Sequence, residues 1–130
     1  MGYLYKAVIV SLIALLIGYG SAQCAVTAAR VAPQPGWELL IFEHRDCTYC
    51  RFFRRDVLPY YRQAVPGDAV PLRFVDLKTA EPSAFALKGR IEAVPTAVLM
   101  KDGEEIGRIV GYWGRDTFFS LLSHLLSRME

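Results

Sequence analysis

Hydrophobic and polar positions between Trp37 and the end of the chain predict seven regular elements. Four short apolar runs have the length of strands, and an Asp-Gly turn at residues 101–104 joins the last two into a hairpin. These strands are predicted at Trp37–Glu43, Leu72–Leu77, Thr96–Met100 and Glu105–Val110. Helices are predicted in three other stretches, which start at Cys47, Ala80 and Asp116. The order β, α, β, α, β, β, α predicts an α/β domain with a mixed β-sheet and helices on both faces.

Prolines set the expected limits of these helices. Pro59 is expected to end or kink the first helix, and residues 66–68 (Pro-Gly-Asp) are expected to form a turn. Pro82 lies in the first turn of the short helix predicted over Ala80–Gly89. The last helix is predicted over Asp116–Met129 and has one apolar face that can pack on the sheet.

The first 22 residues have a different pattern. A short start with one lysine precedes an apolar run over residues 7–17, and small residues follow. This layout is typical of a secretory signal peptide. The apolar run gives about 16 Å of helix, which is shorter than the roughly 30 Å hydrocarbon core of a bilayer. We therefore expect a signal peptide over residues 1–22, with a retained membrane anchor as the alternative, then a linker over 23–36 and one domain over 37–130.

Composition and charge exclude several classes of protein. A chain of 130 residues allows one ordinary domain. Hydrophobic residues make up 53% of it, which argues against a disordered chain. The 15 Lys and Arg residues nearly balance the 13 Asp and Glu residues, so bulk charge gives no reason to expect nucleic-acid binding. A monomer is the default expectation for this size.

The candidate chemistry lies in the sequence Cys47-Thr48-Tyr49-Cys50. Helical spacing brings the two sulfurs within reach of a disulfide. Cys47 is expected at the start of the helix, where free N–H groups stabilise a thiolate, so it is the candidate nucleophile and Cys50 the resolving thiol. A static structural disulfide, a zinc site and a pair of inert buried cysteines are the alternatives. His44 is a candidate to tune Cys47 by its charge, and a loop histidine without such a role is the alternative.

Several ordered features resemble the thioredoxin superfamily. A strand, a loop and a Cys-x-x-Cys helix are followed by Val94-Pro95-Thr96 before a hairpin, and Gly111 comes sixteen residues after Pro95. The resemblance implies a thioredoxin-like fold, thiol–disulfide oxidoreductase activity, and a cis proline beside the cysteine pair. A trans proline that opens a strand is the alternative reading. The substrate groove that the resemblance and the loop aromatics suggest consists of Thr48, Tyr49, Val94, Pro95, Gly111, Tyr112 and Trp113.

The chain departs from ordinary thioredoxins near the cysteines. Asp46 stands where they have tryptophan, and Thr48-Tyr49 replaces Gly-Pro. The position of their buried aspartate is occupied by Ile41. Glu43 is then the nearest carboxylate that could accept a proton from Cys50, and a solvated charge at the strand end is the alternative.

A narrower resemblance is to the small periplasmic thioredoxins of bacterial sulfur-oxidation systems. Glu43, Tyr49, Pro71–Asp76, and Gly107–Tyr112 ahead of Phe118-Phe119 are similar to that group. It implies a periplasmic reductase, with no cofactor or metal, that keeps the cysteine of a sulfur-carrier protein reduced. Its electrons would come from a membrane thiol-electron transporter. The alternatives are a periplasmic disulfide oxidase or isomerase, a non-catalytic binding module, and metal delivery.

Overall fold

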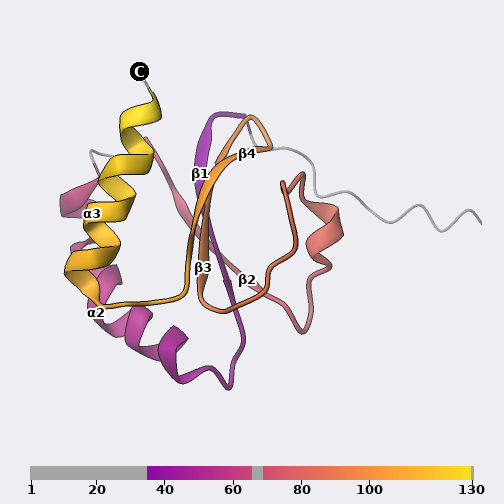
Figure 1. The fold of residues 1–130 in the computed structure, drawn as a ribbon, viewed down its shortest axis with the longest axis horizontal. Helices are drawn as coiled ribbons and strands as arrows, with labels where there is room; N and C mark the ends of the chain where they lie inside the picture. The colour runs from indigo at the N-terminus through magenta and orange to yellow at the C-terminus, as the bar shows by residue number, and fades with distance from the viewer. Residues whose placement is uncertain (1–34, 66–68, 130) are drawn as a thin grey trace, which may run out of the picture.

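The computed structural model describes residues 35–65 and 69–129, which form a four-stranded sheet with two α-helices (Figure 1). The strands are β1 (Trp37–Glu43), β2 (Leu72–Asp76), β3 (Thr96–Lys101) and β4 (Glu104–Val110). The helices are α2 (Thr48–Ala64) and α3 (Arg115–Leu126), and two short 3₁₀ helices lie at Pro82–Ala84 and Ser127–Met129. The prediction of a mixed sheet flanked by helices is confirmed.

The sheet topology gathers three chain segments at one end of the sheet. The strand order is β2-β1-β3-β4, with β1 parallel to β2 and β3 antiparallel to both β1 and β4. Phe42 of β1 pairs with Thr96 of β3, which in turn pairs with Val110 of β4. The segments that follow β1, precede β3 and follow β4 therefore lie side by side, toward the lower edge of Figure 1.

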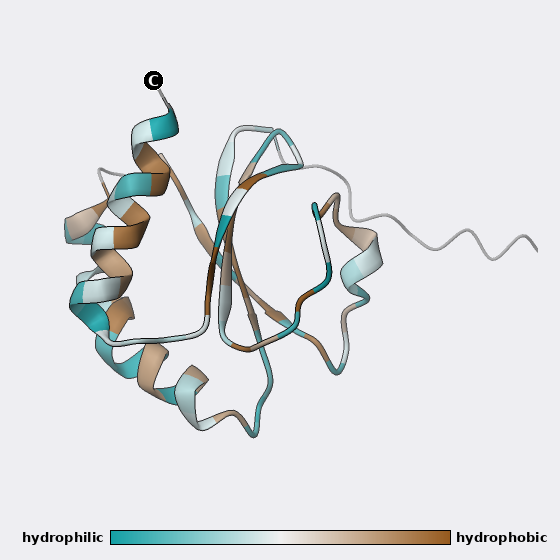
Figure 2. Cartoon of the chain, in the orientation of Figure 1, coloured by the Kyte–Doolittle hydropathy of each residue, from teal (hydrophilic) through white to brown (hydrophobic). Residues whose placement is uncertain are grey.

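Both α-helices cover the same face of the sheet. Alternation along β1 sends Leu39 and Ile41 toward the helices and sends Leu40 and Phe42 to the opposite face. Phe53 of α2 lies in this main core with its ring centroid 4.9 Å from that of Phe118 of α3. Figure 2 shows the hydrophobic residues of α3 concentrated on the side that faces the strands.

The predicted helix over Ala80–Gly89 is wrong. Within this stretch the structure has only the 3₁₀ helix at Pro82–Ala84, so an irregular segment covers the second face of the sheet in place of an α-helix. Phe85 and Leu87 both pack on this face. Their spacing of two residues suits an extended segment and not a helix face.

The predicted end of the first helix at Pro59 is also wrong, because α2 continues to Ala64. The second half of α2 stays in place because Val57 and Tyr61 are buried in the main core. Burial raises the pKa of Tyr61. Its hydroxyl therefore stays protonated and donates to the carbonyl of Val70 at 3.0 Å.

The predicted hairpin between β3 and β4 is confirmed. Asp102 and Gly103 form its turn with φ angles of 50° and 85°, which suit a two-residue hairpin loop. The Asp102 carboxylate accepts a hydrogen bond of 2.8 Å from the Gly36 N–H, and Asp102 N–H donates to the Gly36 carbonyl at 2.9 Å. The start of β1 is thus fixed to the hairpin turn, at the end of the sheet away from the cysteines.

A β-bulge interrupts the pairing of β3 with β4. Leu99 pairs with Gly107 and Met100 pairs with Glu105, so Ile106 is an extra residue in β4. Side chains three apart normally point to opposite faces of a strand. The extra residue changes this alternation and brings Glu105 and Arg108 together on one face.

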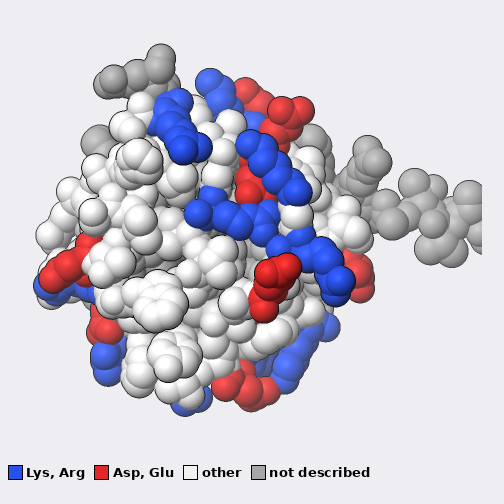
Figure 3. Space-filling model, viewed as in Figure 1, with Lys and Arg blue, Asp and Glu red and all other residues white. Residues whose placement is uncertain are grey.

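Glu105 and Arg108 fix the irregular segment to β4. Glu105 is 4% exposed and accepts hydrogen bonds from Arg108 Nε (2.7 Å), Arg108 Nη2 (2.6 Å) and the Lys88 N–H (2.7 Å). Arg108 also donates to the carbonyls of Gly89 and Arg90. These bonds hold the irregular segment against the edge of the sheet, where Figure 3 shows basic and acidic side chains gathered.

The predictions for the start of the chain lie outside the described residues. These are the signal peptide or anchor over residues 1–22 and most of the linker over 23–36, and the turn at 66–68 is likewise not described. Among the helices of the described ranges, none is long and apolar enough to cross a membrane.

Candidate active site

Cys47 occupies the position that caps the N-terminus of α2. Its backbone is extended (φ −83°, ψ 114°), and its Sγ accepts a hydrogen bond of 3.0 Å from the Cys50 N–H. The first turn of α2 contains no acidic residue. Free N–H groups and the helix dipole at such a position stabilise a negative sulfur.

Cys47 and Cys50 form a disulfide in this structure, with Cα atoms 5.2 Å apart. Cys50 is 3% exposed, whereas Cys47 is only partly buried. A partner sulfur can therefore approach Cys47 but not Cys50. This difference in exposure is what the predicted attacking role of Cys47 and resolving role of Cys50 require.

The segment before β3 lies directly against the disulfide. The Val94 carbonyl oxygen is 3.6 Å from Cys47 Sγ, the Val94–Pro95 peptide bond is cis, and Pro95 is buried. Gly111, at φ +78°, donates its N–H to the Pro95 carbonyl at 2.8 Å. The backbone of Val94 and Pro95 therefore lies next to Cys47 Sγ. It is held there by β3, which follows Pro95, and by Gly111, which follows β4.

Two aromatic side chains are exposed in the segments that surround the site. Tyr49, between the cysteines, is 61% exposed and packs edge-on against Phe52. Trp113, in the connection after β4, is 78% exposed and donates its indole N–H to the Val110 carbonyl at 3.3 Å. Thr48 is exposed as well. The surface over this connection and α3 is largely uncharged (Figure 3).

Tyr112 differs from the other predicted groove residues because its ring packs inward. The ring lies 5.8 Å from that of Phe53, and its hydroxyl donates to the Asp56 carboxylate at 3.3 Å. Burial, and after it the charge of Asp56, raise the pKa of Tyr112. The Tyr112 side chain therefore anchors the connection after β4 to α2. This connection presents Trp113 to solvent.

A cavity of about 440 Å³ adjoins Cys50 on the side of β1 and β2, and Glu43 lines it. Both oxygens of Glu43 bind Arg54, with Nε at 2.9 Å from one of them. The Arg54 guanidinium in turn lies 3.5 Å from the centre of the Phe74 ring. Glu43 and Cys50 therefore line the same cavity, and Glu43 is also held in an ion pair with Arg54.

Asp76 and His44 line the same cavity. Asp76 could have been found from the sequence, because it lies near the end of the second predicted strand as Glu43 lies at the end of the first. In the structure the two residues pair at the C-terminal ends of the parallel strands β1 and β2. Parallel strands of α/β sheets place functional groups at those ends. Asp76 pairs with Arg45 at 3.5 Å and accepts from the Lys78 N–H at 2.9 Å.

The charge of Asp46, directly before Cys47, is balanced by Lys78. The two side chains form an exposed ion pair, and the hydrogen bond from Lys78 is the main cause that lowers the pKa of Asp46. A negative charge on Asp46 opposes the negative charge of a Cys47 thiolate. The pairing with Lys78 reduces that opposition.

Sequence comparison with protein families matches residues 26–126 to a thioredoxin-like domain. The chain belongs to the thioredoxin-like family. No curated protein sequence matches it. Among solved structures, this thioredoxin-like protein is similar to the reduced form of the periplasmic thioredoxin SoxS from Paracoccus pantotrophus. The identity is 32%, the TM-score is 0.65, and the match covers 72% of this chain and 99% of SoxS.

Other thioredoxins share the fold at lower identity. The thioredoxin of Fasciola hepatica is 24% identical with a TM-score of 0.53, over 75% of this chain and 84% of its own. A mutant thioredoxin of Halobacterium salinarum is 23% identical with a TM-score of 0.53, over 75% and 80% of the two chains. Within this thioredoxin-like protein, Ile41 is fully buried in the main core, where ordinary thioredoxins carry an aspartate.

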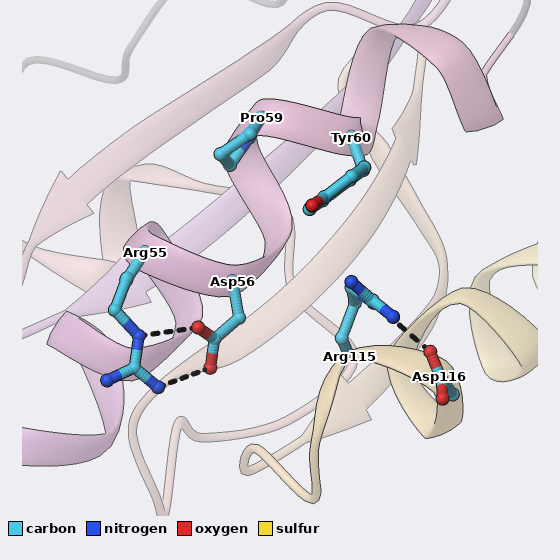
Figure 4. A pocket seen from close by; sticks show the side chains of 6 residues that line it. All are labelled: Arg55, Asp56, Pro59, Tyr60, Arg115 and Asp116. Carbon is cyan, nitrogen blue, oxygen red and sulfur yellow. Dashed lines mark hydrogen bonds and ion pairs between the residues drawn. The ribbon is translucent and has the colours of Figure 1, made fainter.

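A second hollow of about 300 Å³ lies between α2 and the start of α3 (Figure 4). Its charged side chains pair among themselves, Arg55 with Asp56 and Arg115 with Asp116. The Arg115 guanidinium also lies 4.8 Å from the centre of the Tyr60 ring. These groups are satisfied by one another, so we assign no chemistry to this hollow.

Metal ligands do not cluster in the described part of this thioredoxin-like protein. Over residues 35–65 and 69–129, no group of three or more His, Cys, Asp or Glu side chains could hold a metal ion.

Proposed function

We propose that this protein is an exported thiol–disulfide oxidoreductase that keeps a cysteine of a periplasmic partner protein reduced. The observation that carries the proposal is the arrangement of the two sulfurs. Cys47 is accessible at the N-terminus of α2 and lies 3.6 Å from the Val94 carbonyl, while Cys50 is buried behind it. An accessible nucleophile beside a shielded resolving thiol is what a two-step exchange needs.

The reaction proceeds in two displacements. The Cys47 thiolate attacks a sulfur of the partner's disulfide or sulfur-modified cysteine, and the bond electrons leave with the other sulfur. Cys50 then attacks Cys47, the mixed disulfide breaks, and the reduced partner departs with the electron pair. The oxidised pair is the state of this structure. A membrane thiol-electron transporter then supplies two electrons to restore the thiols.

Similarity to SoxS supports the compartment in this proposal, and the sequence resemblance to the thioredoxins of sulfur-oxidation systems supports the partner. The match covers 99% of that periplasmic thioredoxin at 32% identity. We accordingly place the protein in the periplasm and propose a sulfur-carrier protein as its substrate. Thr48, Tyr49, Val94, Pro95, Gly111 and Trp113 would contact that partner, with Tyr112 supporting Trp113 from behind. The protein acts as a monomer, and it contacts a membrane only if its N-terminal segment is retained.

The test is to trap the partner with Cys50→Ser, expressed in the native host with export intact. Without the resolving thiol, Cys47 stays bound to its substrate as a mixed disulfide. Non-reducing gels and mass spectrometry identify what it holds. The matched control is Cys47→Ser, which keeps Cys50 but removes the accessible cysteine of the pair. With Cys24→Ser in both variants, it is expected to trap nothing.

Capture of a sulfur-carrier protein by Cys50→Ser supports the proposal. Capture of many unrelated exported proteins would indicate a disulfide oxidase or isomerase instead. If Cys50→Ser captured nothing while Cys47 remained reactive toward a small thiol reagent, a non-catalytic binding module would be the better description.

A further inference from the structure

A histidine beside the Cys50 cavity has a buried imidazole nitrogen without a hydrogen-bond partner among the described residues. His44 lines this cavity together with Cys50. Its Nδ1 atom is buried, and among the described residues no group bonds to it. Buried polar atoms are normally paired, so an unpaired one calls for an explanation such as a catalytic role.

The backbone fixes His44 close to the cysteines. Its carbonyl accepts a hydrogen bond of 3.2 Å from the Cys47 N–H, immediately before α2 begins. The side chain is thus attached to a short, well-defined turn between β1 and α2. A neutral imidazole with its proton on Nε2 offers Nδ1 as an acceptor.

The two carboxylates of the cavity are less suited to take a proton from a thiol. Both oxygens of Glu43 bind Arg54. Asp76 accepts from the Lys78 N–H and pairs with Arg45. A proton acceptor works best when its pKa is near the pH of the reaction. Free imidazole meets that condition because its pKa lies near neutral pH. Carboxyl groups in general have pKa values far below those of thiols, so a carboxylate accepts a thiol proton less readily.

We propose that His44 accepts the proton of Cys50 when Cys50 displaces the partner from Cys47. The proposal rests on the proposed function, because it assigns the proton of that second displacement. The Cys50 sulfur forms a bond to Cys47 Sγ, and its proton passes to His44 directly or through one water. The bond from Cys47 to the partner sulfur breaks, and its electron pair leaves on the partner as a thiolate. In the reverse reaction, protonated His44 returns the proton to Cys50.

Charged groups from β1, the turn after it, α2 and the end of β2 lie around the cavity that His44 lines. β1 contributes Glu43, the turn contributes Arg45 and Asp46, α2 contributes Arg51 and Arg54, and the end of β2 contributes Asp76. Lys78, which pairs with Asp46, follows β2. The pH dependence therefore has to be measured on the intact protein.

The experiment separates the two displacements with dithiobis-nitrobenzoate, an aromatic disulfide that releases a coloured thiolate at each step. The full chain carries Cys24→Ser so that only the paired thiols react, and it is mixed, reduced, with one equivalent of the probe. The first release reports attack by Cys47, and the second reports resolution by Cys50. Stopped-flow absorbance follows both between about pH 6 and about pH 9.

His44→Asn removes the titrating group but keeps a polar atom near the position of Nδ1. We expect its second release to be at least about tenfold slower than that of the wild type at about pH 7. The difference should shrink to within about twofold at about pH 9, where Cys50 ionises without help. The first release should stay within about threefold, which shows that the fold and Cys47 are intact. His124→Asn, an exposed histidine on α3, is the matched control and should resemble the wild type.

Three results would overturn the inference. A second release in His44→Asn equal to that of the wild type at every pH excludes His44 as the acceptor. Equal slowing of both releases assigns His44 to Cys47 instead. Slowing in Glu43→Gln but not in His44→Asn moves the proton to the carboxylate. A wild-type chain that gave neither release would overturn the proposed function itself, and the inference with it.

Discussion

At the scale of single residues, Glu105 is a charged side chain that is buried in the fold and paired with Arg108. Its carboxylate is 4% exposed and receives three hydrogen bonds, two of them from Arg108. The hydrogen bonds from Arg108 are the main cause that lowers the pKa of Glu105 below its ordinary value. Its contribution to stability is therefore full above the ordinary carboxyl pKa and is lost as the pH falls through the lowered value.

Glu105→Gln tests this contribution. We expect the substitution to lower the free energy of unfolding by about 2 kcal/mol near pH 7, because a neutral amide accepts more weakly from Arg108 and leaves its charge uncompensated. The difference from the wild type should narrow as the pH falls below the ordinary glutamate pKa of 4.5 and through the lowered value, where Glu105 itself becomes neutral. Urea unfolding at a series of pH values measures it.

Glu104→Gln is the control for this prediction. Glu104 is the exposed neighbour of Glu105 on the same strand, and its change should cost less than about 0.5 kcal/mol. A stability difference for Glu105→Gln that stayed constant over the whole pH range would contradict the assigned role of its charge.

At the scale of elements, close packing of β4 on α3 leaves no room at Gly107. A β-carbon added there would lie 2.8 Å from Cδ2 of Leu125, a residue of α3 that is 7% exposed. The glycine follows the extra residue of the bulge, where the strand lies directly under the helix. Its small size, and not an unusual backbone angle, is what the packing requires.

Gly107→Ala should therefore destabilise the protein. The added methyl group forces Leu125 or the whole of α3 to shift, and we expect a loss of about 1 to 2 kcal/mol. Gly89→Ala is the matched control, because nothing lies within 4 Å of the added carbon there, and it should change stability by less than about 0.5 kcal/mol. Thermal unfolding of both variants checks this, and equal midpoints would show that α3 moves without cost.

Sequence patterns predicted those parts of the fold and site that depend on local spacing. The strands, the hairpin turn and the position of Cys47 before a helix all follow from residues close together in the chain. Glu43 and Arg54, in contrast, belong to different elements and meet only because α2 packs back over β1. Glu105 and Arg108 share a face only because of the bulge. Contacts that depend on three-dimensional packing leave no periodic pattern to read.

At the scale of the whole molecule, the two faces of the sheet are covered by different kinds of structure. Two α-helices with their internal hydrogen bonds cover one face. The irregular segment over residues 77–91 covers the other and depends on side-chain contacts, among them the edge-on packing of Phe85 against Phe42 at 5.5 Å. Segments with few internal backbone hydrogen bonds open at lower cost than helices in a main core.

Hydrogen exchange should reveal this difference. We expect amides of residues 80–91 to exchange before those of α2 and α3 at neutral pH. Glu105→Gln should accelerate exchange in residues 80–91 more than in α2, because the contacts of Glu105 and Arg108 hold the irregular segment directly. Mass spectrometry of peptic fragments resolves the two regions, and uniform acceleration in both would show that the two faces open together.

The hydrogen bonds between Gly36 and Asp102 determine how the domain can be attached to a surface. They fix the start of β1 beside the hairpin turn. The other end of β1, which leads to Cys47, is one strand length of about 20 Å away. A chain coupled to a bead or an electrode through residues before Pro35 would thus hold the Cys47 end of the sheet away from the support, open to molecules in solution. Coupling through the turn between β1 and α2 would place the same end against the support and block it.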